Sequence, residues 1–130
     1  MPAIGKPRST KGLALFCARI AEEKIAQDIL ILDLSKIETA PSDFFVICSC
    51  DTDNQTRAIS DAIDSKCRDY GLKRPKFEGV ESGQWVLLDF FDVVVHIMIN
   101  TVREYYKLEK LWGDAAFYKV SSDGKLAAVK

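Results

Sequence analysis

Four aspartates near the ends of predicted strands are the residues in this 130-residue chain that could hold a divalent cation. Asp51 and Asp53 follow one predicted strand, and Asp89 and Asp92 stand at the turn between two others. Enzymes that transfer nucleotidyl groups hold Mg²⁺ on two or three carboxylates and bind the phosphates on backbone amides. These residue types therefore admit a divergent nucleotidyltransferase-like, nucleotide-binding enzyme.

The turn that would bind the phosphates lacks the glycines that such a turn needs. Residues 49–55, SCDTDNQ, contain no glycine, so the main chain cannot easily approach a triphosphate, and the two aspartates would repel it unless a metal intervened. Neither G-x-x-x-x-G-K nor G-x-G-x-x-G occurs in the chain. Asp51, Thr52 and Asp53 are also of the types that cap a helix and offset its dipole. We therefore assign no catalytic residue, no metal ligand and no cofactor.

His96 is the only histidine and could act as a base if a carboxylate oriented it. Asp89 is a candidate for that carboxylate, because it belongs to the preceding strand. Nucleophilic catalysis also needs a nucleophile within reach, and the sequence offers none. Two other interpretations stay open. Either His96 hydrogen-bonds Asp89 or a backbone group beneath a helix, or the surface serves recognition with Trp85 as its anchor.

The four cysteines do not predict a metal site. Cys17 and Cys67 fall on apolar stripes of predicted helices, and Cys48 and Cys50 lie on one face at the end of a predicted strand. Their spacing is not that of a zinc ribbon, so buried, inert thiols are expected. The N-terminus lacks the apolar segment of a secretory signal, and no run approaches the ~20 apolar residues of a membrane span. We expect a cytoplasmic protein with reduced thiols and no membrane association.

Hydrophobic periodicity and turn residues predict the elements that must position these side chains. Thr52 with Gln55 forms a capping box for a helix that Gly71 ends, and Thr101 with Glu104 forms a second box. Helices are expected at 13–25, 52–71 and 101–112, and strands at 28–34, 43–48, 84–90 and 93–99. The order α-β-β-α-β-β-α, to which residues 76–78 could add a short strand, predicts a single α/β (α+β) domain with helices flanking a mixed sheet.

The last two predicted strands form a hairpin with two unlike faces. If its loop has an even number of residues, odd positions of the first strand share a face with even positions of the second. One face is then wholly apolar and belongs to the core: Val86, Leu88, Phe90, Val93, Val95, Ile97 and Ile99. The other face mixes polar and apolar groups: Trp85, Leu87, Asp89, Val94, His96 and Met98. Phe90-Phe91 suits a type I′ turn poorly, because both central residues there need positive φ.

The helix expected at 101–112 is rich in aromatic residues. Tyr105, Leu108 and Trp112 form one stripe, and Tyr106 with Glu109 forms a neighbouring one. A terminal helix with a wide apolar stripe would explain this pattern. A helix that contacts another protein would explain it too, because aromatic and charged residues alternate along it.

Charge is distributed unevenly along the chain. The net charge of −1 divides into +3 for residues 1–12, −6 for residues 13–118 and +2 for residues 119–130. We therefore expect a basic N-terminal tail, one acidic domain and a C-terminal tail with these boundaries. An acidic domain argues against nucleic-acid binding through its own field and admits a basic protein partner. The apolar fraction of 48% excludes a disordered chain.

Six segments in this order resemble the ribosomal silencing factor family, also called RsfS or Iojap. They are DILILDL, DFFVICS, NQTRAISD at 54–61, Glu78-Gly79, WVLLDFFDVVVH, and R-x-Y-Y-x-L-E-x-L-W at 103–112. The resemblance covers nearly all of residues 13–118 and implies a nucleotidyltransferase-like fold without the catalytic residues. It also implies a protein that is not an enzyme and that binds the large ribosomal subunit through ribosomal protein L fourteen. By occupying the intersubunit face it would block association with the small subunit and repress translation under nutrient limitation.

The same resemblance implies a contact surface for that partner. Its expected members are Glu78, Trp85, Asp89, His96, Tyr106, Glu109 and Trp112. The basic tails could add a minor contact to ribosomal RNA, and the aromatic surface could support a homodimer when no ribosome is present. The nucleotide-binding enzyme is the rival interpretation.

Overall fold

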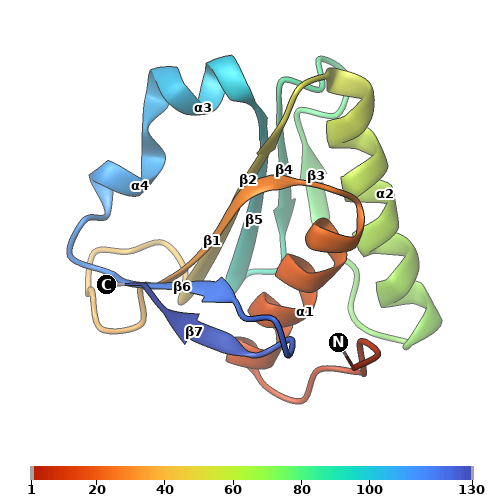
Figure 1. Cartoon of the computed structure of the whole chain (residues 1–130), viewed down its shortest axis with the longest axis vertical. Coiled ribbons are helices and arrows are strands. Elements are labelled where there is room, and N and C mark those ends of the chain that lie inside the picture. Colours follow the sequence, from red (N-terminus) through yellow and green to blue (C-terminus); the bar gives the residue numbers. More distant parts are fainter. Residues whose placement is uncertain (1, 130) are drawn as a thin grey trace.

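A computed structural model describes residues 2–129 and contains one seven-stranded sheet with helices on both faces (Figure 1). The strands are β1 (Gln27–Asp33), β2 (Phe44–Cys50), β3 (Lys76–Glu78), β4 (Trp85–Asp89), β5 (Val93–Ile99), β6 (Ala116–Val120) and β7 (Leu126–Ala128). The helices are α1 (Thr10–Glu23), α2 (Asp53–Asp69), α3 (Asn100–Tyr106) and α4 (Leu108–Leu111). The strand order is β3-β4-β5-β2-β1-β6-β7, and β2 and β5 form the one parallel pair among these strands. The predicted mixed-sheet α/β class is confirmed.

The hairpin of β4 and β5 has the two faces that alternation predicts. Trp85 pairs with Met98 and Leu88 with Val95, so the loop between the strands has an even length. The apolar face packs against α1 and α2, and its central residues are fully buried: Val86, Leu88, Val93, Val95 and Ile97. Burial of each such side chain contributes about 1.5–3 kcal/mol. This face is the main hydrophobic core.

Helices α1 and α2 begin at capping residues. The Ser9 hydroxyl accepts a hydrogen bond from the Gly12 amide at 2.9 Å, and the Thr52 hydroxyl accepts one from the Gln55 amide at 3.1 Å. The predicted end of α2 at Gly71 is also confirmed, because that residue has a φ of 65°. None of the helices described between residues 2 and 129 is long and apolar enough to cross a bilayer.

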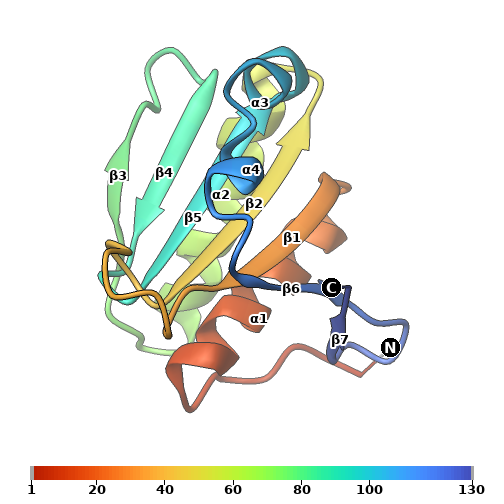
Figure 2. The same ribbon diagram turned by 90° about the vertical axis from the view of Figure 1, so that its left-hand side faces the viewer.

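The opposite face of the sheet is covered less completely. Figure 2 shows α3 and α4 crossing in front of β5 and β2, with α1 and α2 behind the sheet and no helix in front of β3. The segment between β1 and β2 folds over the lower end of this face. A second, smaller cluster of buried residues lies here: Leu32, Leu34, Phe45, Ile47, Met98 and Ala115.

The predicted helix at 101–112 is wrong as a continuous element. Lys107 has a left-handed φ of 48°, so α3 ends there and α4 starts in a new direction. The predicted capping box at Thr101 and Glu104 is wrong as well. Helix α3 follows β5 directly, its N-cap is Ile99, and that residue provides no side-chain cap.

The two predicted tails are largely structured. Ile4 is buried, and its carbonyl accepts a hydrogen bond from the Tyr70 hydroxyl at 2.7 Å. The expected boundary at residue 118 falls inside β6, and β7 pairs with β6 to extend the same sheet. Sequence reasoning missed both strands, although the turn at 121–124 between them ends in a glycine with a φ of 80°.

Candidate docking surface

Six rings in consecutive contact cross the face that carries α3 and α4. We call them the aromatic row, in this order: Tyr105, Tyr106, Trp85, His96, Phe45 and Trp112. Successive ring centroids are 5.0, 5.0, 5.9, 4.5 and 6.1 Å apart. These tilted and edge-on contacts lie in the range in which aromatic rings attract one another. The fold thereby brings together four of the seven predicted contact residues, which are Trp85, His96, Tyr106 and Trp112.

The row runs from solvent into the protein. Tyr105 is 80% exposed and Tyr106 57%, whereas Trp85 and Trp112 are half-buried. His96 is only 6% exposed and Phe45 only 5%. The two tyrosines can therefore touch a partner directly, half-buried Trp85 can do so in part, and His96 supports the surface from beneath.

Trp85 is fixed by a hydrogen bond to His96. The indole Nε1–H of Trp85 donates to His96 Nδ1 at 3.1 Å. An indole nitrogen can only donate, so His96 is neutral with its proton on Nε2. The two residues are diagonal neighbours, because Trp85 pairs with Met98 and Leu87 pairs with His96. Trp85 is consequently held in one orientation before any partner arrives.

The predicted hydrogen bond from His96 to Asp89 or to a backbone group is wrong. Asp89 Oδ1 instead accepts the Phe91 amide at 2.7 Å, inside the turn between β4 and β5. Phe91 has a φ of 76°, and the Asp92 amide bonds the Phe90 carbonyl at 3.0 Å, which is the pattern of a γ-turn. The Asp89 carboxylate is therefore engaged within this strained turn and does not hydrogen-bond His96.

Burial lowers the pKa of His96 to about 4. The imidazole lies beneath Trp85 and Phe45, where a cation would lose its hydration. Protonation at Nδ1 would also remove the acceptor that holds Trp85. Among residues 2–129, no group accepts a hydrogen bond from His96 Nε2. The neutral imidazole is therefore the form that the aromatic row requires near pH 7.

Arg103 braces the bend between α3 and α4. This residue is 8% exposed, and its Nη1 donates to the Asp28 carbonyl at 2.5 Å and to Ser49 Oγ at 3.3 Å. Its Nε donates to Glu109 Oε2 at 3.3 Å. The predicted contact residue Glu109 thus turns inward and ties α4 to α3. With the break at Lys107, this brace leaves Leu111 73% exposed.

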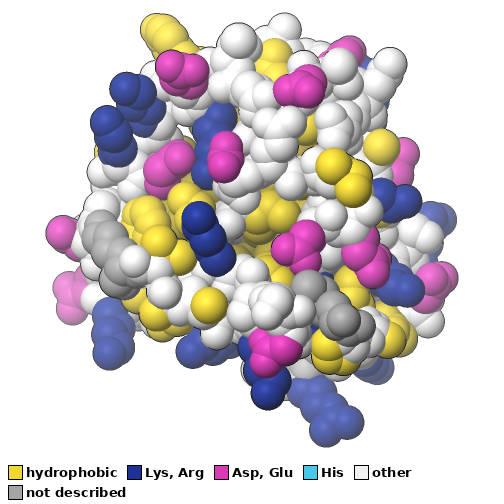
Figure 3. All heavy atoms as spheres, in the orientation of Figure 1, with side chains coloured by type: hydrophobic (Ala, Val, Ile, Leu, Met, Phe, Trp, Pro, Cys, Tyr) yellow, Lys and Arg dark blue, Asp and Glu magenta, His cyan; other side chains and the backbone are white. Residues whose placement is uncertain are grey.

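Like Glu109, the predicted contact residues Glu78 and Asp89 lie outside the aromatic row. Glu78 pairs with Leu87 and Asp89 with Val94, so both side chains belong to the same face as Trp85 and His96. Both are exposed and lie near the β3 edge of the sheet. Figure 3 shows acidic and basic side chains interspersed on the side that it views, with hydrophobic atoms gathered near its middle.

The four aspartates of the nucleotide hypothesis are divided between two ends of the sheet. Asp51 follows β2 and accepts a hydrogen bond from Asn100 Nδ2 at 2.7 Å, and Asp53 pairs with Arg57 at 3.1 Å. Asp89 and Asp92 lie at the β4–β5 turn, beside the first residues of β2 and β5. These carboxylates therefore do not form one cluster. No metal-binding group of three or more ligating side chains occurs within residues 2–129.

All four cysteines are buried free thiols, as predicted. Burial raises the pKa of Cys48 to about 12 and that of Cys67 to about 11. Thiols of this kind are poor nucleophiles because the reactive thiolate is suppressed. The cysteines thus belong to the core.

Sequence reasoning missed three residues that shape the surface. Phe45 joins His96 to Trp112, and Arg103 and Lys107 set the bend that exposes Tyr105. Phe45 stands in a strand buried on both faces, where alternation carries no signal. Lysine is an unusual residue for a left-handed position, so nothing in the sequence marked the bend.

Comparison with known proteins points to one family. The model of the family described as "Ribosomal silencing factor during starvation" matches residues 7–129. The protein named Ribosomal silencing factor RsfS from Bacillus subtilis is 41% identical over 105 residues, which are 81% of this chain and 88% of that protein. The protein of the same name from Halalkalibacterium halodurans is 36% identical over 107 residues, 82% of this chain and 91% of the relative.

Solved structures agree with these relatives. The crystal structure of a Chromobacterium violaceum protein has a TM-score of 0.76 to this chain at 34% identity, and covers 82% of this chain and 88% of its own. The chain belongs to the ribosomal silencing factor family.

Proposed function

We propose that this protein silences ribosomes by binding the large subunit through ribosomal protein L fourteen, on the face where the small subunit joins. The bound domain would occupy the space that the small subunit needs, so the two would exclude each other without a chemical step. Translation would fall under nutrient limitation, in the cytoplasm. Membership of the silencing factor family supports the ribosomal role.

The exposed end of the aromatic row carries the proposal for where the partner docks. Tyr105 and Tyr106 present two rings to solvent, and Trp85 lies 5.0 Å behind Tyr106 in a fixed orientation. Tyrosine and tryptophan are the residues that most often dominate the affinity of protein interfaces. Because these rings are already ordered, docking would cost little side-chain entropy.

Charge supports a basic partner on the same face. Residues 13–118 carry a net charge of −6, and Glu78 and Asp89 are exposed beside the β3 edge. Acidic residues at the rim of an interface accelerate association with a basic protein and contribute less to its lifetime. In this proposal Tyr106 and Trp85 hold the partner, Glu78 and Asp89 attract it through their charge from outside the buried contact, and His96, Glu109 and Trp112 support them.

Two weaker interactions accompany this proposal. The lysines and the arginine of residues 1–12 could add minor contacts to ribosomal RNA. The exposed tyrosines could also join two copies of the chain when no ribosome is present. The RNA contacts would add to docking, and the contact between two copies would compete with it. Docking needs neither of them.

Sedimentation with purified subunits tests the proposal. At saturating concentration the protein should migrate with the large subunit and reduce the peak of joined ribosomes. At a concentration near the wild-type dissociation constant, the Tyr106→Ala variant should lose most of both effects, whereas Phe91→Ala should retain them, because Phe91 is an exposed aromatic residue at the opposite end of β4. An unchanged peak of joined ribosomes at saturating wild-type protein would contradict the proposal.

A further inference from the structure

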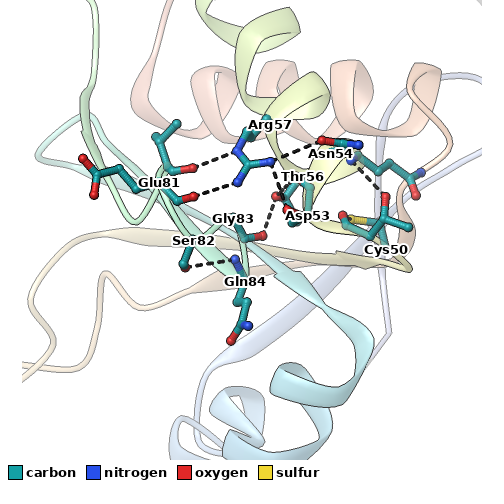
Figure 4. Close-up of polar contacts among 12 residues, drawn as sticks. Cys50, Asp53, Asn54, Thr56, Arg57, Glu81, Ser82, Gly83 and Gln84 are labelled. Atoms are coloured by element: carbon teal, nitrogen blue, oxygen red, sulfur yellow. Dashed lines mark hydrogen bonds and ion pairs between the residues drawn. The ribbon is translucent and has the colours of Figure 1, made fainter.

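Arg57 joins two segments that lie far apart in the sequence. It stands in the first turns of α2, within the segment NQTRAISD, and its guanidinium reaches the loop between β3 and β4 (Figure 4). Its Nε donates to the Val80 carbonyl at 2.9 Å and its Nη2 to the Glu81 carbonyl at 2.7 Å. One planar guanidinium group thus holds two consecutive carbonyls of an exposed loop.

The base of this contact is fixed by α2 itself. Arg57 Nη1 donates to Asp53 Oδ2 at 3.1 Å and to Asn54 Oδ1 at 3.3 Å. The Thr56 hydroxyl donates to the Gly83 carbonyl at 2.5 Å, which adds a third anchor for the loop. The guanidinium is therefore oriented by its own helix, so it need not be ordered by the loop.

Two glycines allow the loop to lie close to its neighbours, which are β4 at Gly79 and α2 at Gly83. Gly79 has a φ of 79°, and a Cβ there would come within 2.1 Å of the Trp85 carbonyl oxygen. Gly83 has a φ of 70°, and a Cβ there would come within 2.8 Å of Asp53 Cβ and 3.0 Å of Arg57 Nη2. A side chain at Gly83 would push the loop away from α2, and one at Gly79 would push the start of the loop away from β4.

The loop leads directly into the docking surface. The Gln84 carbonyl accepts the Ile99 amide at 2.9 Å, next to the start of α3, and Trp85 is the following residue. Trp85 then turns its side chain to the opposite face, against His96 and Tyr106. Whatever fixes the loop also fixes where β4 begins, and a shift of one residue would place Trp85 on the wrong face.

We infer that Arg57 is a positioning residue for docking on the large subunit: it clamps the loop at 79–84 and so keeps Trp85 and Tyr106 in the arrangement that binds. This inference rests on the proposed function for its partner. Apparent affinity falls in proportion to the fraction of molecules that hold the binding arrangement. If loss of the clamp leaves about one tenth of the molecules in that arrangement, affinity falls about tenfold.

The test compares Arg57→Ala with matched variants. Binding to immobilised large subunits is measured together with the melting temperature and with amide exchange of residues 79–85. We expect Arg57→Ala to bind about tenfold more weakly, with fast exchange in the loop and a melting temperature within about 4 °C of wild type. Arg57→Lys should recover part of the affinity, because an ammonium can satisfy one carbonyl but not both in the same planar geometry.

Two further variants separate geometry from charge. Gly83→Ala displaces the same loop without changing the charge and should also weaken binding about tenfold. Arg68→Ala removes the same charge from the same helix, where Arg68 lies 4.0 Å from Asp64 and away from the loop. It should bind within about twofold of wild type, as a surface substitution outside the interface does.

Two results would contradict the role of Arg57 in docking. A loosened loop with unchanged affinity would overturn the inference, and so would a loop whose exchange is unchanged in Arg57→Ala. If Arg57→Ala does not fold, Arg57→Lys and Gly83→Ala carry the same comparison. If the wild type itself fails to bind large subunits, the proposed function fails instead. The clamp is then judged by loop exchange and by Trp85 fluorescence in a Trp112→Phe background.

Discussion

The two faces of the sheet are closed in different ways. On one face α1 and α2 cover a continuous apolar layer in which Val86, Val95 and Ile97 are fully buried. On the other face a bent pair of short helices covers only part of the sheet, and the aromatic row leads from buried Phe45 to exposed Tyr105. The first face can supply most of the stability. On the second face the aromatic side chains are less buried, and they form an ordered surface.

The difference shows how a small domain keeps aromatic rings at its surface without losing their order. Exposed aromatic side chains alone would be mobile and prone to association. Here each exposed ring rests on a less exposed one, and the row is anchored by the bond from Trp85 to His96. The buried residues of the second face therefore hold its exposed rings in place, whereas those of the first face stabilise the folded domain.

Ile97→Ala should destabilise the core on the first face and leave binding through the second face unchanged. Ile97 is fully buried between the sheet and its two long helices, so truncation should cost about 2–5 kcal/mol of unfolding free energy. Urea unfolding measures this loss. The folded fraction should bind large subunits within about twofold of wild type, since a buried core position makes no interface contact. If Ile97→Ala bound large subunits more weakly at unchanged stability, the first face would be the docking face, contrary to our proposal.

Acid should weaken the second face through His96. Its pKa is about 4 in the folded protein, against about 6.5 for an unperturbed imidazole. Between these values the unfolded chain binds more protons than the folded one, so stability rises with pH in this range. Full stabilisation is present above about pH 6.5, and up to about 3 kcal/mol is lost as the pH falls to about 4.

A matched variant isolates that contribution. His96→Gln keeps an acceptor for the Trp85 indole but does not titrate between pH 4 and 7. Unfolding free energies of the two proteins, measured across this range, should diverge as the pH falls, and the wild type should lose more. Parallel curves would show that His96 is not buried as a neutral base.

Tyr106→Ala should act on binding alone. The side chain is 57% exposed and contacts the partner in our proposal, so its loss should cost about 2 kcal/mol of affinity, or about 30-fold. Unfolding free energy should change by less than about 0.5 kcal/mol, as for most surface positions. Titration of large subunits together with urea unfolding checks both parts. A stability loss equal to the affinity loss would assign Tyr106 to the core.

Phe91→Gly should produce the smallest effect and with the opposite sign. Phe91 is 80% exposed at the β4–β5 turn with a φ of 76°, a conformation that glycine adopts without strain. Relief of strain should exceed the added entropy of the unfolded chain and raise stability by about 1 kcal/mol. Thermal unfolding measures the gain. Reduced binding to large subunits would instead place this end of the sheet inside the interface.

Local chemistry in the sequence predicted the parts that depend on neighbours in the chain. The period of two sorted the hairpin correctly, because its loop has an even length and one face is wholly apolar. Thr52 and Gly71 marked the ends of α2 for the same local reason. These features need no knowledge of distant contacts.

The features that sequence reasoning missed depend on contacts between distant segments. The bend at Lys107 is stabilised by Arg103, which reaches Asp28 and Ser49 on β1 and β2. Asp89 was one candidate partner for His96, but its carboxylate accepts the Phe91 amide within its own turn. Of the predicted contact residues, the structure groups four in the aromatic row, and their role in binding stays a prediction.

Hydroxyl-radical footprinting tests most directly which face docks. Oxidation of exposed aromatic side chains is compared in the free protein and in its complex with large subunits. Tyr105 and Tyr106 are 80% and 57% exposed and should be protected in the complex. Phe91, 80% exposed at the other end of the sheet, should be oxidised equally in both states. Protection of Phe91 with Tyr105 and Tyr106 still oxidised would contradict the account.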